Sequence, residues 1–398
     1  MTRPEKGVTL PLGFRAGAAH CAIRKKSPDL ALIVSDRDAS AACVYTRNQV
    51  QAAPILACRE VMQRSGGLAR AVLANSGNAN ACTGDAGLAA ARRMGSEAAR
   101  LLGVDEALVL VASTGVIGQP LPIEKVVKGL PRAVAALSID GHDDAARAIM
   151  TTDLVQKESG RTVQLSSGVA RIGGMAKGSG MIHPDMATTL AFLTTDAAIA
   201  PGLLQEMLRA ATDRTFNRIS VDGDTSTNDM IALLANGASD AGVGDAQAPA
   251  FEAALHDVLL DLALMIARDG EGATKLISIT VRGARSMDDA LKVSRTIASS
   301  PLVKTAIAGE DANWGRIVAA AGRAGVPLDP SRLTVLLGDV AVLEPGYVSR
   351  HSEEAATAQV KKDTVDIVVD LALGTASATT WTCDLTHGYI DINGSYRS

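Results

Sequence analysis

Aromatic residues are scarce in this sequence, and this and related absences exclude several classes of protein. Among 398 residues there are four Phe, four Tyr and two Trp, so stacking platforms for bases or sugars would be hard to build. Basic blocks are absent and the formal net charge is -4, which argues against a nucleic acid or an anionic membrane as partner. No apolar run reaches the roughly 18 residues of a membrane helix.

Cysteine and histidine spacing also lacks the usual ligand patterns. The five cysteines are odd in number and contain no C-x-x-C pair, which argues against a disulfide framework and against a zinc site. The six histidines show no ligand spacing either. Residues 1–9 are polar and charged, without an apolar signal segment, so we expect a cytoplasmic protein.

The remaining composition is that of a globular protein with an ample core. Hydrophobic residues make up 47% and charged residues 21% of the chain, and the length suits two domains or one large α/β unit. Periodicity predicts strands at 30–35, 71–74, 108–112, 189–195, 275–282 and 333–337, and helices at 85–102, 123–137, 143–150, 202–213, 249–267 and 287–298. This mixture in both halves predicts an α/β (α+β mixed) fold.

Two weaker structural predictions concern the middle and the end of the chain. Glycine density peaks between residues 160 and 188, which suggests a domain boundary there. Apolar and polar residues alternate from Thr364 to Ile392, which predicts two or three antiparallel strands.

Two glycine-containing runs superficially resemble binding loops but lack the required spacing. In the run 173–179, Lys177 precedes a glycine instead of following it, so the Walker pattern fails. The run 222–229 begins like a calcium loop, but Thr227 occupies the position of the obligatory glycine and Leu233 that of the bidentate glutamate.

The most informative stretch lies near the middle of the chain, at 177–190. There the small residue Ala187 directly precedes Thr188 in a glycine-rich, turn-prone context, as a self-cleaving peptide bond requires. After cleavage, Thr188 would carry both a hydroxyl nucleophile and a free α-amine, a base with a pKa of about 8. The alternative interpretation is an ordinary Ala-Thr pair after a glycine turn.

Three further motifs admit both a catalytic and an ordinary interpretation. The turn Ser113–Gly118 follows a predicted strand, and it could direct the Thr114 hydroxyl and a backbone N–H at Gly115 toward an oxyanion. It could equally be a plain strand-to-loop turn, as could the polar loop 75–80. Glu271 lies between two glycines, where it could hold a substrate ammonium or simply be solvated.

These motifs, taken in order, resemble one family along essentially the whole chain. The matching segments are 7–14, 29–36, 75–80, 113–118, 150–153, 177–190, 220–229, 269–275, 313–316 and 393–398. The sequence resembles the ornithine acetyltransferases of arginine biosynthesis, which are also called bifunctional glutamate N-acetyltransferase/amino-acid acetyltransferase.

The resemblance implies a self-processed acyltransferase with N-terminal-nucleophile chemistry and a two-domain architecture. Cleavage between Ala187 and Thr188 would give an α chain of residues 1–187 and a β chain of residues 188–398. Thr188 would take the acetyl group of N2-acetyl-L-ornithine and pass it to L-glutamate in a ping-pong reaction. The family also implies an α2β2 heterotetramer and neither cofactor nor metal, while use of acetyl-CoA as a second acetyl donor stays open.

The same resemblance assigns individual roles. Thr114 and Gly115 would form the oxyanion hole. The substrate-binding positions are Thr152, Lys177, Thr188, Glu271, Asn393 and Ser398. This set suits an amino-acid substrate, whose carboxylate would pair with Lys177 and whose ammonium would pair with Glu271. His183 and Asp185 depart from the family pattern just before the scissile bond, so they bear on the rate of cleavage.

Two alternatives remain at this stage. A self-processed N-terminal-nucleophile amidohydrolase or aminopeptidase would use the same nucleophile but deliver the acyl group to water. A non-catalytic small-molecule-binding protein could have kept the fold, although it would not need Thr188 or the Thr114-Gly115 turn.

Overall fold

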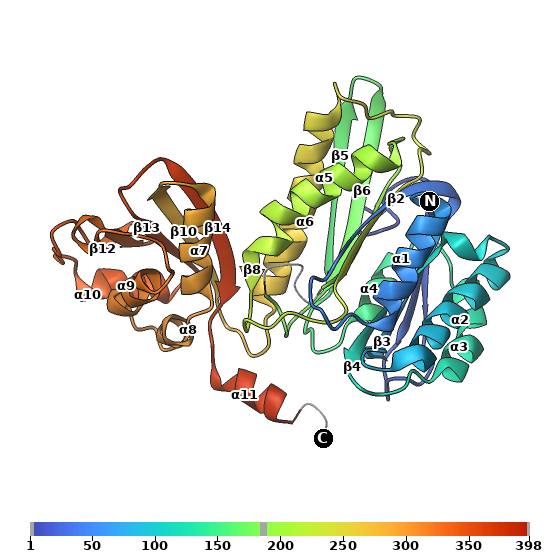
Figure 1. Ribbon diagram of the computed structural model, residues 1–398, viewed down its shortest axis with the longest axis horizontal. Helices are drawn as coiled ribbons and strands as arrows, with labels where there is room; N and C mark the ends of the chain where they lie inside the picture. Colours follow the sequence, from blue (N-terminus) through green and yellow to red (C-terminus); the bar gives the residue numbers. More distant parts are fainter. Residues whose placement is uncertain (1–3, 184–188, 396–398) are drawn as a thin grey trace. The chain divides into compact units, whose positions relative to one another are not determined.

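A computed structural model describes residues 4–183 and 189–395 of the chain. These residues form two compact units, each with its own β-sheet (Figure 1). Within the described ranges, the larger unit contains residues 4–181, 189–217 and 224–266, and the smaller unit contains 182–183, 218–223 and 267–395. No described helix is both long enough and apolar enough to cross a membrane.

The larger unit is built on an eight-stranded mixed sheet. Its strands are β1 (Phe14–Ala19), β2 (Leu30–Tyr45), β3 (Leu68–Asn78), β4 (Val109–Val116), β5 (Lys157–Leu165), β6 (Gly168–Lys177), β7 (Leu190–Thr195) and β9 (Met230–Ala235). Seven follow the order β4-β3-β2-β9-β7-β6-β5, and β1 pairs with β2 outside this path. The β3–β4 and β7–β9 pairs are parallel and the others are antiparallel.

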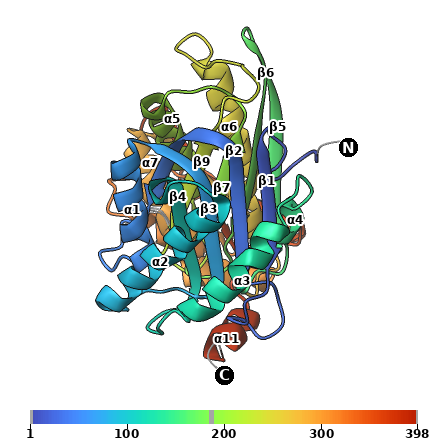
Figure 2. The same cartoon turned by 90° about the vertical axis from the view of Figure 1, so that its right-hand side faces the viewer.

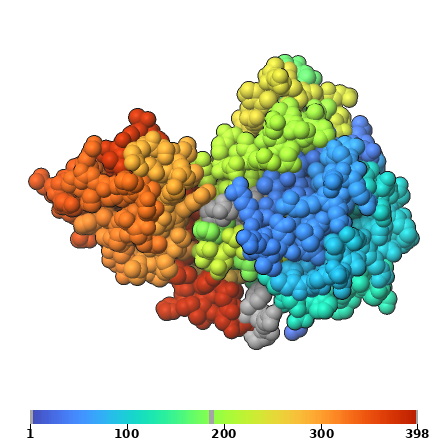
Figure 3. All heavy atoms as spheres, in the orientation of Figure 1, coloured from blue at the N-terminus to red at the C-terminus, as the bar shows by residue number. Residues whose placement is uncertain are grey.

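Six helices cover this sheet (Figure 2). They are α1 (Ala53–Ser65), α2 (Gly84–Leu102), α3 (Ile123–Ala135), α4 (His142–Ile149), α5 (Pro201–Arg214) and α6 (Ala248–Arg268). Helices α1 and α2 pack on β4, α3 and α4 pack on β1, and α5 packs on β2. The surface coloured blue to cyan in Figure 3 belongs to the N-terminal part of the chain, which includes α1 and α2.

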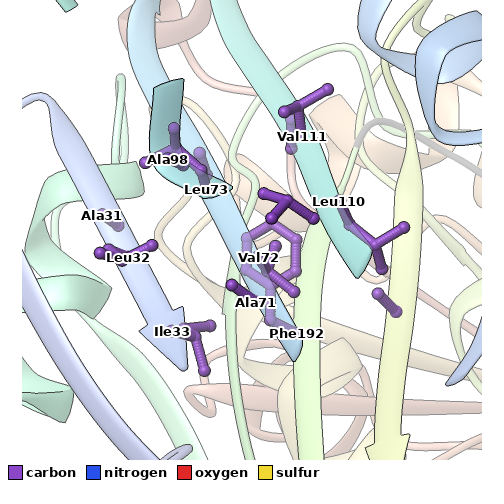
Figure 4. Packing of buried hydrophobic residues seen from close by; sticks show 14 of the residues in the cluster. Ala31, Leu32, Ile33, Ala71, Val72, Leu73, Ala98, Leu110, Val111 and Phe192 are labelled. Atoms are coloured by element: carbon purple, nitrogen blue, oxygen red, sulfur yellow. The ribbon is translucent and has the colours of Figure 1, made fainter. Parts of the chain in front are cut away.

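The core of the larger unit consists of aliphatic side chains from neighbouring strands. Figure 4 shows residues 31–33 of β2, residues 71–73 of β3, Leu110 and Val111 of β4 and Phe192 of β7. All are at most 2% exposed. Since burial of each Val, Leu, Ile or Phe side chain in this set contributes about 1.5–3 kcal/mol, these contacts stabilise the packing of the four strands.

A cysteine of α1, Cys58, forms hydrogen bonds with the backbone of the edge strand β4. The Val111 N–H donates to Cys58 Sγ (3.2 Å), and the Cys58 thiol donates to the Val111 carbonyl (2.9 Å). Burial raises the pKa of the Cys58 thiol far above its usual range, so the thiol keeps the proton that it donates. Both outward-facing backbone groups of Val111 are therefore paired, although β4 has a neighbouring strand on one side only.

Replacing Cys58 by alanine should therefore destabilise the fold. The substitution leaves the N–H and C=O of Val111 unpaired in a buried place, so we expect a loss of about 1–3 kcal/mol in the free energy of unfolding. Urea denaturation measures it, with Cys82→Ala as the matched control because Cys82 is exposed. Equal stability of the two variants would contradict this account.

The smaller unit has its own six-stranded sheet and its own core. Its strands are β8 (Ile219–Ser220), β10 (Leu276–Ala284), β11 (Thr334–Leu337), β12 (Val340–Leu343), β13 (Thr364–Asp370) and β14 (Ala376–Cys383), in the order β12-β11-β13-β10-β14-β8. Its helices are α7 (Met287–Ala298), α8 (Pro301–Ala308), α9 (Trp314–Gly322), α10 (Glu353–Val360) and α11 (His387–Gly394). Helix α7 packs on β10 and β14.

The predicted mixed α/β class is confirmed, and the predicted helices appear within a few residues of their expected bounds. The predicted boundary at 160–188 is not the main division, because β5, β6 and β7 all belong to the large sheet and only residues 182–183 of the described chain there belong to the smaller unit. The glycines there permit close packing: a Cβ at Gly173 would lie 2.0 Å from the Gly7 carbonyl oxygen, and one at Gly160 would lie 2.6 Å from Leu10 Cδ2. The units divide mainly after residue 266.

The prediction for residues 364–392 is partly wrong. Strands β13 and β14 are present, but they do not pair with each other, because β10 lies between them. The last part is the helix α11. Its N-terminus is capped by Thr386, whose hydroxyl accepts the Gly388 N–H (3.1 Å), a local signal that the alternating pattern obscured.

Candidate active site

The residue after the predicted nucleophile is firmly placed. Ala187 and Thr188 lie outside the described residues, but Thr189 is 2% exposed and directly precedes β7. Its N–H donates to Asp229 Oδ1 (2.8 Å), and its carbonyl accepts the Met230 N–H (3.0 Å). The parallel pairing of β7 with β9 brings these residues together, since Leu190 lies opposite Met230.

Lys177 ends the neighbouring strand β6, opposite Leu190. Its side chain is 5% exposed. Its Nζ lies 3.4 Å from Thr114 Oγ1 and 4.0 Å from Asp153 Oδ2. The predicted substrate-binding lysine and the predicted oxyanion-hole threonine are thus in contact, although they are 63 residues apart.

Asp153 is the acidic partner of this lysine. Its Oδ1 also accepts from Lys157 Nζ and from the Gly178 N–H, both at 2.7 Å. Burial opposes ionisation, but the ammonium groups of Lys177 and Lys157 outweigh it and hold the pKa of the Asp153 carboxyl well below its usual range. Thr152 directly precedes this anionic carboxylate and is half-buried.

The predicted oxyanion turn at 113–118 is mostly strand, because residues 113–116 end β4 and only Ile117 and Gly118 form a turn. Its backbone at Gly115 is one that only glycine adopts readily. Gly115 has φ +134°, and a Cβ there would lie 2.3 Å from the Gly77 carbonyl carbon. Thr114 is 7% exposed. The Ser113 hydroxyl donates to Asn75 Oδ1 (2.6 Å), and Asn75 Nδ2 donates to the Asn78 carbonyl (2.9 Å). The end of β3, which contains Asn75 and Asn78, therefore supports the end of β4.

A small cavity lies where these elements meet. Among described residues its lining is Thr114, Lys177, Thr189, Leu190, Ser226, Asn228 and Asp229. Burial raises the pKa of the Asp229 carboxyl well above its usual range, although the Thr189 N–H and the Lys177 ammonium oppose that shift. The pKa values of two carboxyl groups near one lysine thus shift in opposite directions, downward for Asp153 and upward for Asp229.

Two other predicted residues meet in the smaller unit. Asn393 of α11 donates from Nδ2 to Glu271 Oε2 (2.7 Å) and to the Tyr389 carbonyl (3.0 Å). Glu271 is 7% exposed, which excludes the alternative of a simply solvated carboxylate. Thr386 donates to the Gly272 carbonyl (2.6 Å), which fixes α11 on the loop that carries Glu271. Ser398 lies outside the described residues.

The segment before the predicted cleavage point is held by the smaller unit. The Ile182 N–H donates to Asp222 Oδ1 (2.9 Å), and the Val221 N–H donates to the Ile182 carbonyl (2.8 Å). His183 Nδ1 lies 3.2 Å from the Ser220 hydroxyl. Asp185 is outside the described residues.

Comparison with known proteins identifies the family. The model of the ArgJ family matches residues 15–398. The arginine biosynthesis bifunctional protein ArgJ of Chlorobaculum tepidum is 51% identical over 389 residues, covering 98% of this chain and 96% of that protein. The chain belongs to the ArgJ family. The family predicted from the sequence is confirmed.

Further ArgJ proteins match over similar lengths. The arginine biosynthesis bifunctional protein ArgJ of Symbiobacterium thermophilum is 50% identical and covers 98% of each chain. The solved structure of arginine biosynthesis bifunctional protein argJ from Bacillus halodurans is 44% identical, covers 51% of this chain and 97% of that chain, and has a TM-score of 0.49.

Sequence reasoning missed several polar residues of this ArgJ-family site. Lys157 was not singled out, and Asp153, Asn228 and Asp229 appeared only within segments that match the family or, for the last two, within a failed calcium loop, without a role of their own. For Asn228 and Asp229, the signal in the sequence was the run of polar residues immediately before the wholly apolar strand β9. No group of three or more His, Cys, Asp or Glu that could hold a metal occurs among residues 4–183 and 189–395.

Proposed function

We propose that this ArgJ-family chain transfers the acetyl group of N2-acetyl-L-ornithine to L-glutamate, after cleaving itself between Ala187 and Thr188. The observation that carries the proposal is the small cavity. It places Thr189, the residue after the nucleophile, beside Thr114 and Lys177. A hydroxyl nucleophile, an oxyanion donor and a carboxylate-binding cation are the groups that acyl transfer between amino acids requires.

The first half-reaction acetylates the enzyme. The Thr188 hydroxyl oxygen attacks the acetyl carbonyl, and the free α-amine of Thr188 takes the hydroxyl proton. The Thr114 hydroxyl and the Gly115 N–H donate to the tetrahedral oxyanion. The C–N bond then breaks, the leaving amine takes the proton from the α-ammonium, and ornithine departs from an acetyl-threonine ester.

The second half-reaction regenerates the enzyme. The neutral amine of glutamate attacks the ester carbonyl and loses a proton to the α-amine. When the C–O bond breaks, that proton returns to the Thr188 oxygen, and N-acetyl-L-glutamate leaves. An acetyl-CoA thioester would produce the same acetyl-threonine, so direct acetylation of glutamate needs no further catalytic group. The acetyl group travels on Thr188 itself, so we propose that neither cofactor nor metal takes part.

Charge pairing selects the substrates in this proposal. Lys177 binds the α-carboxylate, and Glu271 binds the ammonium of the ornithine side chain. Asn393 orients the Glu271 carboxylate through the bond described above. Thr152 and Ser398 supply the remaining hydroxyl contacts.

The large sheet supports lasting association of the two cleaved chains. Residues 1–187 supply β1 to β6, and residues 188–398 supply β7 and β9. Strand β7 pairs with β6, and β9 pairs with β2. Cleavage would therefore leave the α and β chains in one sheet, and we propose that they assemble as an α2β2 heterotetramer in the cytoplasm.

Intact mass spectrometry under denaturing conditions tests the proposal. The purified protein should give two species, the second beginning at Thr188, whose masses sum to that of the precursor plus one water. Brief incubation with acetylornithine should add one acetyl group to the second species, and glutamate should remove it as N-acetylglutamate. If the acetyl group removed from the second species appears only as free acetate, the acceptor is water and the protein is an amidohydrolase.

Replacing Glu271 by glutamine should weaken substrate binding more than it slows chemistry. Glutamine keeps the shape and an acceptor for Asn393 but lacks the charge that pairs with an ammonium. A hydrogen bond to a charged group is worth about 1.5–3 kcal/mol, so KM for acetylornithine should rise about 10- to 100-fold. Steady-state kinetics measures it, with Glu353→Gln as control because the Glu353 side chain is 85% exposed. A KM equal to that of the control would remove Glu271 from the binding site.

A further inference from the structure

Asn228 and Asp229 form a buried polar pair with no role in the reaction as written so far. They end the run 222–229 and directly precede β9, and they are 6% and 1% exposed. Both line the small cavity of the larger unit. Polar groups in such a place are costly unless their bonds serve the structure or the chemistry.

Asn228 forms hydrogen bonds with the backbone beside the predicted oxyanion residues at the end of β4. Its Nδ2 donates to the Ser113 carbonyl (2.9 Å) and to the Ala79 carbonyl (2.6 Å). Its Oδ1 accepts the Thr227 hydroxyl (2.6 Å), which fixes the orientation of the amide. Ser113 directly precedes Thr114, so the Asn228 side chain fixes the backbone just before Thr114 and links it to residues 75–80.

Asp229 forms a hydrogen bond with Thr189, the residue directly before β7. Its Oδ1 accepts the Thr189 N–H (2.8 Å), and this N–H belongs to the peptide bond that joins Thr188 to Thr189. Its main-chain carbonyl accepts the Thr46 N–H (3.0 Å), which anchors Asp229 to the end of β2. Asp229 Oδ2 is buried and has no hydrogen-bond partner among the described residues.

The pKa shift of Asp229 suits this place. Burial raises the pKa of its carboxyl well above its usual range and so favours the neutral form, while Oδ1 accepts the Thr189 N–H. The charged groups around it are Lys177 at the end of β6 and Asp153, which pairs with that lysine. A second anion here would hold the α-amine of Thr188 in its charged form and compete for Lys177, whereas a neutral carboxyl does neither.

We propose that Asn228 and Asp229 are positioning residues that set the nucleophile strand at a fixed distance from the oxyanion turn. The Asn228 side chain binds Ser113, the residue before Thr114. The Asp229 side chain binds Thr189, the residue after Thr188. Because Asn228 and Asp229 are adjacent in sequence, their backbone fixes the spacing between Thr189, which precedes β7, and Ser113 of β4. This inference rests on the proposed acyl transfer at Thr188.

Such a role predicts a loss in kcat rather than in substrate binding. A displacement of about 1 Å between reacting groups costs about 100-fold in rate. Asn228→Ala and Asp229→Ala should therefore each lower kcat and the rate of chain cleavage by about 100-fold, while KM changes by less than about threefold because Lys177 and Glu271 are untouched.

Two isosteric variants separate positioning from bulk effects. Asp229→Asn keeps an acceptor for the Thr189 N–H and stays neutral, so it should restore most of the kcat lost in Asp229→Ala. Asn228→Asp keeps the acceptor for Thr227 but loses both donors, so it should be as slow as Asn228→Ala. Because both isosteric variants keep the side-chain volume, their kcat can be measured even where an alanine variant fails to fold.

Asp196→Asn is the matched control. Asp196 is a buried carboxylate that follows the far end of β7 and accepts the Leu12 N–H (2.9 Å) and the Arg171 N–H (2.7 Å). Its replacement should lower the melting temperature, but it should leave the kcat of the folded protein unchanged.

The possible outcomes are distinct. If Asn228→Asp or Asp229→Ala retains wild-type kcat and cleavage rate, the positioning role is overturned. It is also overturned if Asp229→Asn is as slow as Asp229→Ala, because the carboxyl would then act chemically. A wild-type protein that neither cleaves itself nor transfers acetyl would overturn the proposed function, and this inference with it.

Discussion

Replacing Thr188 by alanine is expected to leave a single uncut chain that transfers no acetyl group. In the proposed mechanism both reactions need the same atom: the hydroxyl oxygen attacks the Ala187 carbonyl during maturation and the acetyl carbonyl during turnover. Loss of a nucleophile of this kind costs at least about 10,000-fold in rate. Intact mass spectrometry reports the cleavage, and a coupled acetylornithine–glutamate assay reports the transfer.

Thr188→Ser is the matched control for this experiment. Serine keeps the hydroxyl and, after cleavage, the free α-amine, so the variant should still be cut and should still form an acetyl ester, only more slowly. Cleavage of Thr188→Ala at the same bond would show that another group attacks the Ala187 carbonyl. A wild-type chain that stays uncut yet transfers acetyl groups would exclude the α-amine as the base.

The sequence indicates the proposed reactive groups of this site better than the residues that support them. Thr114, Gly115 and Lys177 stand out in the sequence because each lies in a glycine-rich segment at a strand end, where a side chain is available for chemistry. Asp229 does not stand out, because its role depends on the parallel register that places Leu190 opposite Met230. That register joins segments 40 residues apart, and no local pattern encodes it.

The same reasoning explains the errors in the predicted fold. Glycines at 160 and 173 were interpreted as a boundary, yet they lie inside strands where a neighbouring backbone leaves no room for a Cβ. Alternation at 364–392 correctly predicted β13 and β14, but it did not show that β10 separates them. Periodicity reports which face of a segment is buried, while strand order depends on contacts distant in sequence.

Replacing Thr114 by valine tests the oxyanion donor separately from the nucleophile. Valine has nearly the shape of threonine but no hydroxyl, and Thr114 is almost fully buried, so packing should persist. Removing one oxyanion donor costs about 100- to 1,000-fold in kcat, and we expect a loss of that size. The Gly115 N–H remains, which is why the loss should be smaller than that of Thr188→Ala.

The control must remove a buried threonine hydroxyl elsewhere in the same sheet. Thr194 of β7 is 1% exposed and donates to the Val8 carbonyl (2.8 Å), so Thr194→Val should cost stability but little kcat. Thr114 Oγ1 also lies within 3.4 Å of Lys177 Nζ, so a loss of substrate binding would appear as a higher KM. A fall in kcat at unchanged KM therefore assigns the hydroxyl to the transition state, whereas a rise in KM alone would assign it to the placement of Lys177.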